Sequence, residues 1–572
     1  MVLEKMQNAW RPVWAGAVLL VVLTGVAYLP ALRGGFIWDD DGHVTENPTL
    51  RSFEGLGDIW VRPGSTQQYY PLVFTSFWME YQLWKLQPFG YHLVNVLLHA
   101  LNAVLLWRLL RRLRIPGAWW AAAVFAVHPV TVESVAWITE RKNVLSSTFY
   151  LLAALAYLRF RPLTGREAGR MWNWRWYPWV LVLFLFALLS KTVTCSLPAV
   201  LVLLTWWKLG RLEKRDGQVL APLFILGLIL GFLTIWMEKH EIGAKGPDWE
   251  LTIIQRCLIA GRALWFYAGK LFWPHDLMFI YPRWRVDAGV AWPYLFPLAA
   301  LSVLVTLWLL RSRIGKGPLV AVLCFAGTLT PALGFFDVYP FRYSFVADHF
   351  QYLACIGLIV LAVSAGATIL ERAGQTTRRV GMLAAAAIVL LLAASTWGRA
   401  EVYRDSETLW QDTLRKNPDC WMAHNNLGVV LARQGKMKEA MGHWVEASRL
   451  KPDFAEVPYN VGVALEQAGR WQEAIGYYEQ ALRIDPGYAK AHNNLGAVLM
   501  RRGAIQEAMQ QWKQALEINP DFAEAHYNLG IALEKEGKVQ EAIGEYKEAV
   551  RLNPDYTEAQ NGLARLRAVI SR

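Results

Sequence analysis

Long apolar stretches in the first 400 residues constrain the fold of this chain more than any other feature. A membrane helix needs about 20 apolar residues to cross the hydrocarbon core of a bilayer, and about eleven stretches reach or approach that length. They cover residues 13–32, 91–110, 117–135, 143–160, 178–195, 197–209, 219–237, 291–311, 317–336, 350–370 and 379–397. Residues 1–400 therefore predict an all-α, polytopic bundle of membrane helices. We expect its first helix to be retained rather than cleaved as a signal peptide.

The chain carries a formal net charge of +12, which alone is compatible with a nucleic-acid partner. Its Lys and Arg residues lie largely in short clusters between the apolar stretches, where they set the orientation of membrane helices. We therefore expect no nucleic-acid partner. If the stretches alternate across the membrane, a single cytoplasmic side collects the basic segments 108–114, 159–175, 208–215, 311–316 and 372–379.

The outer side then holds residues 128–142, the region 238–290 and the whole chain after residue 400. Residues 251–273 are an apolar run whose two ends should both lie outside, and three basic residues interrupt it. We expect this run to form an amphipathic helix on the outer membrane surface.

The carboxy-terminal part carries a repeat with a period of 34 residues. Three sets of positions follow this period: Pro418, Pro452, Pro486, Pro520 and Pro554; Gly435, Gly469, Gly503 and Gly537; and the Glu-Ala pairs that begin at 439, 473, 507 and 541. Such a unit resembles the tetratricopeptide repeat, a helix-turn-helix module that stacks into an α-solenoid. We expect a linker and partial repeat at 401–419, four repeats at 420–555 and a capping helix at 556–572.

Three adjacent carboxylates, Asp39, Asp40 and Asp41, follow the first apolar stretch directly. At headgroup level, such a carboxylate can accept a proton from an incoming hydroxyl, and crowding of like charges raises one pKa toward the working range. Two other interpretations stay open, a solvated acidic turn and a site for a divalent cation, which prefers oxygen ligands. The five cysteines form no CxxC pair, so neither a zinc site nor a disulfide framework is indicated.

The second apolar stretch contains His92, Asn95, His99 and Asn102, whose spacing places them on one helical face. Polar side chains in a membrane helix face the bundle interior or a water-filled cavity. The sequence leaves both roles open, namely hydrogen bonding between helices and the lining of a cavity.

Further polar residues lie at expected turns on the outer side. His128 and Glu133 precede the pair Arg141 and Lys142, whose side chains can bind phosphate or form simple ion pairs. Lys191 interrupts an apolar run near the outer boundary, where it can also snorkel to the interface. The remaining two candidates, which either hold a phosphate or cap a helix, are Asp348 and His349.

One asparagine per repeat also follows the 34-residue period. An asparagine ladder can hydrogen-bond an extended peptide backbone along the concave groove of a solenoid, or it can serve the scaffold alone. The four positions are Asn426, Asn460, Asn494 and Asn528.

The order of these segments is similar to that of bacterial relatives of the transmembrane and tetratricopeptide-repeat (TMTC) O-mannosyltransferases, in the GT-C superfamily of polyprenyl-phosphate-dependent glycosyltransferases. Together the similar segments cover nearly the whole chain. They are 36–40, 70–72, 90–95, 126–129 with Glu133, 140–142, 190–191, 347–349 with 352–353, and the repeats.

The resemblance implies that the chain transfers a sugar, such as mannose, from a polyprenyl phosphate to a protein hydroxyl on the outer side, with inversion. Asp39 or Asp40 would be the base, and Glu133 would support the site. The donor phosphate would be held by Arg141, Lys142 and Lys191, with His349 where the family often has Arg. Independently of the resemblance, the candidates for lining a cavity are His92, Asn95, His128 and Asp348. The lipid-linked sugar would be the donor substrate, and the repeats would bind the polypeptide acceptor.

A bacterial relative of this family would lie in the inner membrane, with its repeats in the periplasm. A second hypothesis is a non-enzymatic scaffold for protein assembly or secretion, in which the membrane part anchors the repeats. A transporter is a third, although the apolar stretches show no paired halves with matching interrupted helices.

Overall fold

The computed structural model describes residues 2–240, 246 and 248–570. Within these ranges the chain is helical and contains no β-strand, which confirms the all-α prediction. It forms two compact units, Met1–Asn417 and Pro418–Arg572, each described here by itself.

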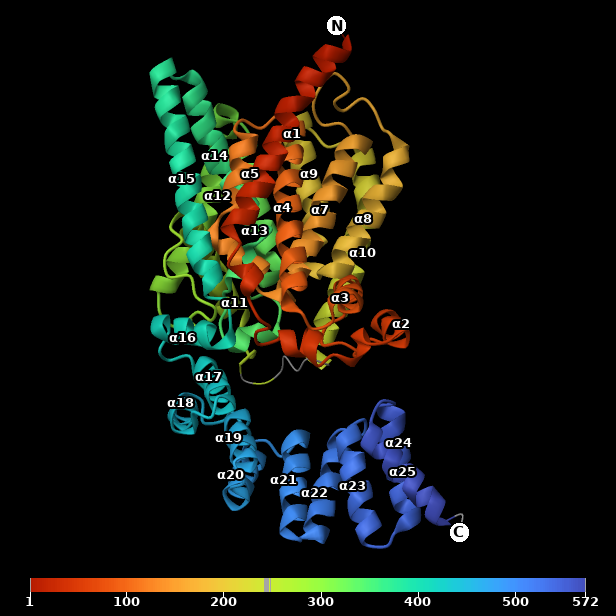
Figure 1. Cartoon of the computed structure of the whole chain (residues 1–572). Helices are drawn as coiled ribbons and strands as arrows, with labels where there is room; N and C mark the ends of the chain where they lie inside the picture. The colour runs from red at the N-terminus through yellow and green to blue at the C-terminus, as the bar shows by residue number, and fades with distance from the viewer. Residues whose placement is uncertain (1, 241–245, 247, 571–572) are drawn as a thin grey trace. The chain divides into compact units, whose positions relative to one another are not determined.

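The first unit is a bundle of long helices joined by short helical segments (Figure 1). Helix α4 packs against α1, α5 and α7, and α7 packs against α8. The long helices are α1 (Val2–Ala27), α4 (Pro88–Arg112), α7 (Arg141–Phe160), α8 (Tyr177–Ser190), α9 (Leu197–Leu209), α10 (Lys214–His240), α11 (Ile253–Phe272), α12 (Leu295–Ile314), α13 (Gly317–Leu329), α14 (Cys355–Arg372) and α15 (Gln375–Glu401). The remaining α-helices of this unit are α2 (Phe53–Val61), α3 (Pro71–Trp84), α5 (Ala118–Ala126), α6 (Val132–Ala136) and α16 (Ser406–Lys416).

Among the described residues, six helical segments are long and apolar enough to cross a membrane. They are Pro88–Arg112, Thr192–Leu209, Lys214–His240, Trp292–Ile314, Cys355–Arg372 and Gln375–Glu401, and the shorter apolar helices are Trp14–Ala27, Trp174–Ser190 and Gly317–Ala332. All nine overlap apolar stretches of the sequence. Helix α12 buries none of its residues, as expected of a helix whose apolar side chains face lipid, and the chain is accordingly an integral membrane protein.

The expected helix at 117–135 is shorter than predicted. Helix α5 ends at Ala126, so its nine residues rise only ~14 Å. Pro129 then holds His128 in an extended conformation, because a residue before proline avoids the helical region. The chain continues through the short helix α6 to α7, whose polar residues hydrogen-bond inside the bundle.

Most of the run at 251–273 forms a single helix, α11 (Ile253–Phe272), which begins with a capping box at Thr252. One face of α11 is buried, and Arg256 on the helix pairs with Asp337 at 2.7 Å. The predicted helix is therefore present, and its location at the membrane surface stays a prediction.

Helix α16 lies in the first unit, although its sequence suggested a partial repeat. Arg399 of α15 pairs with Asp412 of α16 at 2.9 Å. At the end of α16, Lys416 donates to the carbonyl of Leu277 and Asn417 to that of Ile280. These contacts join α16 to the helix bundle.

The second unit consists of paired antiparallel helices. A left-handed glycine ends the turn within each pair, at φ values of 77°, 73°, 89° and 77° for Gly435, Gly469, Gly503 and Gly537, which explains this part of the period. The helices are α17 (Trp421–Arg433), α18 (Met437–Leu450), α19 (Glu456–Gln467), α20 (Trp471–Ile484), α21 (Ala489–Arg502), α22 (Ile505–Ile518), α23 (Ala523–Lys535), α24 (Val539–Leu552) and α25 (Thr557–Ile570). Residues 571–572 of the expected capping helix lie outside the described residues.

Packing within a repeat is close because a glycine on the first helix faces an aromatic ring on the second. A Cβ atom on Gly496 would lie 2.7 Å from the indole nitrogen of Trp512. Trp512 is fully buried and donates a hydrogen bond to the carbonyl of Asn493. The predicted α-solenoid is confirmed.

Candidate active site

The three adjacent aspartates occupy different environments. Asp40 is fully buried. Its carboxylate accepts hydrogen bonds from the backbone NH of Ile37 at 2.9 Å and from the backbone NH and hydroxyl of Thr139 at 2.8 and 2.7 Å. Asp41 accepts a hydrogen bond from the hydroxyl of Thr45 at 2.9 Å. Asp40 therefore joins the loop to the segment before α7, and Asp41 stabilises a local turn.

Asp39 is half-buried, and no described residue forms a hydrogen bond or an ion pair with its carboxylate. Burial raises the pKa of Asp39 to about 6, while the positive charges of Lys142 and His349 lower it. The charge of Glu140 raises it further. Asp39 is thus a carboxylate with free acceptor atoms beside a cluster of charged groups, and its raised pKa suits a general base.

Glu140, which is fully buried, is the centre of that cluster. Its two carboxylate oxygens lie 3.1 Å from Nζ of Lys142 and 3.3 Å from Nζ of Lys191. Asn143 donates to Glu140 and accepts a hydrogen bond from Lys191 at 2.9 Å. Burial by itself would raise the pKa of Glu140, but the charges of His349, Lys142 and Lys191 outweigh burial and hold this pKa well below its usual range.

His349 connects the segment before α14 to the same cluster. Its Nδ1 lies 2.9 Å from Glu133, and its backbone NH donates to the same carboxylate at 3.2 Å. Its Nε2 lies 3.9 Å from Glu140. Glu133 therefore orients the imidazole, and the predicted residues Glu133, Lys142, Lys191 and His349 do gather at one place.

Arg141, by contrast, points away from this cluster and corrects one prediction. Its guanidinium is fully buried and forms an ion pair with Glu80 of α3. It also donates to the side chain of Asn95 and to the carbonyl of Tyr91 at 2.8 Å. Because these internal acceptors occupy its donors, Arg141 is not available to bind a donor phosphate.

Three of the residues expected to line a cavity form hydrogen bonds with other parts of the bundle. His92 and Asn95 are fully buried and bond the carbonyls of Gly35 and Trp137. Asp348 accepts a hydrogen bond from Tyr281 at 2.9 Å. These contacts fit hydrogen bonding between segments, and the lining of a cavity by these three residues stays a prediction. His99 and Asn102 likewise bond within the bundle.

His128 is the exception among the expected lining residues. Its Nε2 bonds the carbonyl of Leu271 at 2.9 Å. It also borders an apolar hollow lined by residues of α5, α11, α14 and α15. The expected lining role of His128 therefore fits a lipid-facing hollow better than an aqueous one.

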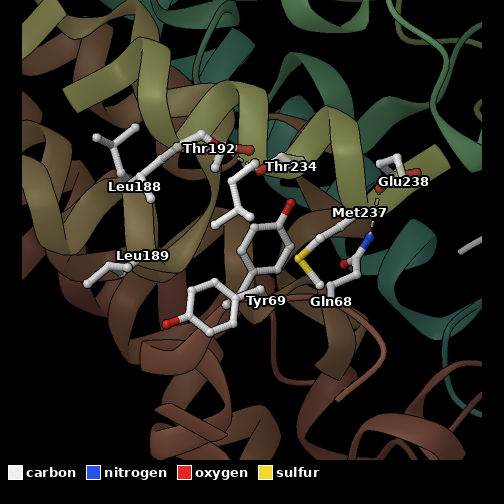
Figure 2. A pocket seen from close by; sticks show the side chains of 11 residues that line it. Gln68, Tyr69, Leu188, Leu189, Thr192, Thr234, Met237 and Glu238 are labelled. Atoms are coloured by element: carbon white, nitrogen blue, oxygen red, sulfur yellow. Dashed lines mark hydrogen bonds between the residues drawn. The ribbon is translucent and has the colours of Figure 1, made fainter. Parts of the chain in front are cut away.

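A small pocket adjoins the charged cluster (Figure 2). Leu188 and Leu189 of α8 and Met237 of α10 give it apolar walls, and Gln68 and Glu238 lie at one end, joined by a hydrogen bond of 3.4 Å. Lys142 donates to the other amide atom, Oε1 of Gln68, also at 3.4 Å. The pocket thus has an apolar part and a polar end that connects to Lys142.

Sequence reasoning did not single out Glu140, Glu80, Gln68 or Glu238 as site residues. The signal for Glu140 was present, since an acidic residue stands directly before Arg141 and Lys142. The role of Glu80 could not be found in this way, because it lies 61 residues from its partner. Within the described ranges, no group of three His, Cys, Asp or Glu side chains is placed to hold a metal ion.

In the second unit, the asparagines of the ladder bond across neighbouring repeats. Asn460 donates to Asn425 at 3.0 Å, Asn494 to the hydroxyl of Tyr459 at 3.2 Å and Asn528 to Asn493 at 3.0 Å. Asn426, in the first repeat, bonds the carbonyl of Met422 within its own helix. The amide nitrogens thus serve the scaffold, and the half-buried side chains keep a possible peptide-facing role as a prediction.

Comparison with known proteins identifies relatives for both parts of the chain. Tetratricopeptide-repeat families match residues 390–460, 467–503, 498–537 and 523–556. A Caenorhabditis elegans protein named protein O-mannosyl-transferase F38B6.6 is 25% identical over 456 residues, which cover 74% of this chain and 61% of that protein. The chain is similar to the TMTC protein O-mannosyl-transferases over about three quarters of its length.

Further relatives carry the same name. Drosophila melanogaster protein O-mannosyl-transferase Tmtc3 is 26% identical over 73% of this chain and 53% of its own length. Drosophila Tmtc1 is 36% identical over 27% of this chain and 19% of its own length. The chain therefore spans between about half and three fifths of the first two relatives. A crystal structure of MamA is 24% identical over 27% of this chain and 89% of that chain, with a TM-score of 0.24.

Proposed function

We propose that this chain is an integral-membrane glycosyltransferase that moves a sugar from a polyprenyl phosphate to a protein hydroxyl on the outer side of the membrane. One observation carries this proposal: the carboxylate of Asp39, which has no hydrogen-bond or ion-pair partner among the described residues, lies close enough to Lys142, Glu140 and His349 for their charges to shift its pKa. A base and an anion-binding group are the two functions that glycosyl transfer from a phosphate requires.

Asp39 is the base in this proposal. Its carboxylate takes the proton from the acceptor hydroxyl as the hydroxyl oxygen attacks C1 of the sugar. The bond between C1 and the phosphate oxygen breaks, and its electron pair leaves with the lipid phosphate. Attack opposite the leaving group inverts C1, as the family resemblance implies. Asp40 is excluded as the base because hydrogen bonds to Ile37 and Thr139 hold its carboxylate.

Lys142 and Lys191 stabilise the leaving phosphate. Both side chains are mostly buried, with 12% and 14% exposed, and both ammonium groups form ion pairs with Glu140. Glu140 therefore brings the two ammonium groups together, and its single negative charge does not neutralise both of them. The imidazole of His349 borders the same group, with its Nε2 3.9 Å from Glu140. In this proposal the lipid chain begins next to the pocket beside Gln68, whose walls are apolar and whose polar end meets Lys142.

The repeats bind the polypeptide acceptor in this proposal, and mannose is the sugar that the names of the relatives suggest. If the cell is bacterial, the site and the repeats face the periplasm. The repeat unit also supports a second candidate, a membrane-anchored scaffold without enzymatic activity, because tetratricopeptide repeats bind proteins.

The test compares Asp39→Asn with Asp41→Asn in membranes supplied with radiolabelled polyprenyl-phosphate mannose. We expect Asp39→Asn to lower label in endogenous protein by about 10² to 10⁴-fold, the usual contribution of a general base, and Asp41→Asn to keep most activity. Elution of both variants as the wild-type species in detergent controls for folding. Loss of label with Asp41→Asn but not with Asp39→Asn would assign the role of base to Asp41. No label with the wild type, while partners still bind the repeats, would favour the scaffold.

A further inference from the structure

Four arginines converge on one pocket at the end of the bundle opposite the proposed active site. Arg108, Arg111 and Arg112 come from the last turns of α4, and Arg159 comes from the last turn of α7. Lys142 stands near the start of α7, and 17 residues of helix place Arg159 ~26 Å from it. This pocket is therefore separate from the proposed donor-phosphate site.

The described residues that line the pocket include no carboxylate. No ion pair joins any of the four arginines to a described acidic residue, although all four side chains are exposed. Four guanidinium groups in one hollow repel one another, so an anion that bridges them would be stabilised. Bidentate hydrogen bonding makes guanidinium groups especially suited to phosphate.

The remaining walls of the pocket are apolar and aromatic. Leu105, Leu152, Leu155 and Leu183 form the surface between α4, α7 and α8, and Trp176 and Trp179 stand at its edge. The guanidinium of Arg159 lies 4.2 Å from the ring centre of Trp176. Tryptophan favours the depth at which lipid headgroups meet acyl chains.

We propose that this pocket binds the phosphate headgroup of an anionic phospholipid, whose acyl chains lie along the leucine surface. Positive residues at the cytoplasmic end of a helix need only set orientation, and scattered charges would do so. Here charges from α4 and α7 meet in one hollow that is also lined by Trp179 of α8 and by Trp176, directly before α8. Basic pockets between membrane helices bind anionic headgroups in the same way. A free phosphate would satisfy the arginines but leave the apolar walls without a ligand.

The experiment uses the full chain purified in detergent, with Arg111→Gln/Arg159→Gln as the test variant. The control, Arg313→Gln/Arg379→Gln, removes two exposed charges at the ends of α12 and α15, outside the pocket. Each protein is incubated with phosphatidylglycerol, with phosphatidylcholine or with inorganic phosphate, and bound ligand is counted by native mass spectrometry. A further variant, Arg111→Lys/Arg159→Lys, keeps the charges that orient the helices and loses bidentate contacts.

We expect the test variant to bind phosphatidylglycerol about tenfold more weakly than the wild type, with the lysine variant between them and the control unchanged. Binding of phosphatidylcholine should be weak in all four proteins. Equal phosphatidylglycerol binding by the test variant and the control would overturn the proposal. Inorganic phosphate that competes at similar concentrations would also overturn it, because the apolar walls would then contribute nothing. Should the glutamine variant fail to fold, unchanged binding by the lysine variant would count against the proposed contacts.

Discussion

An ion pair from each unit of this chain shows how differently a charged pair can be placed. In the membrane unit, Arg141 and Glu80 pair with 0% and 5% of their side chains exposed. In the repeat unit, Arg449 and Glu446 pair on the same helix with 62% and 34% exposed. A buried pair is costly to form and costly to break, whereas an exposed pair contributes little. Charges that stay buried in the membrane unit therefore mark either its architecture or its chemistry, and those of the repeats mark a soluble surface.

The largest expected effect comes from breaking the buried pair. Glu80→Gln leaves the guanidinium of Arg141 without its ionic partner inside the bundle. We expect a loss of about 3–5 kcal/mol in the free energy of unfolding, measured by denaturant titration in detergent with intrinsic fluorescence. Retention of stability to within about 1 kcal/mol would mean that water or lipid reaches this arginine.

The next effect concerns the cations around Glu140. Lys191→Gln removes a charge that the proposed mechanism places against the leaving phosphate, so sugar transfer should fall about 100-fold, as when one preorganised donor is lost. Lys239→Gln, an exposed lysine at the end of α10, is the matched control and should change little. Equal activity of the two variants would remove Lys191 from the mechanism.

A smaller effect is expected from pH. The pKa of Asp39 is raised to about 6 by burial, and a general base works only when deprotonated. The transfer rate should therefore rise about tenfold between pH 5 and pH 7, following the deprotonated fraction. The measurement is an initial rate at saturating donor across this range. A flat profile would contradict Asp39 as the base.

The smallest effect is expected in the repeats. Glu446→Gln removes the exposed pair with Arg449 and should leave the stability of the full chain unchanged, because solvent screens an exposed pair. Trp512→Ala in the same unit is the positive control, because it empties the space between paired helices and should cost about 3–5 kcal/mol. A large loss of stability in Glu446→Gln would show that exposed ion pairs also stabilise the repeat unit.

The repeat unit was predictable in detail because its contacts are local. Gly435 adopts a left-handed conformation at the turn within its repeat. Gly496 faces Trp512 on the next helix, so both residues of this contact lie in one 34-residue unit. In the membrane unit, the apolar stretches predicted most helices, but not the end of α5 at Ala126. The helix ends there because of Pro129 and the polar residues after it, and a count of apolar residues does not take these into account.

The apolar stretches and the 34-residue period were enough to predict the two parts of the protein, its helical class and a set of candidate site residues. The contacts of those residues came from the fold: Thr139 bonds Asp40, whereas Asp39 has no partner among the described residues, and Arg141 pairs with Glu80 while Lys191 pairs with Glu140. The physical reason is that hydrogen bonds and ion pairs satisfy the donors and acceptors of a buried site. Their partners lie far apart in the chain, as with Glu133 and His349, 216 residues away. Which charge remains available for chemistry is therefore settled by folding.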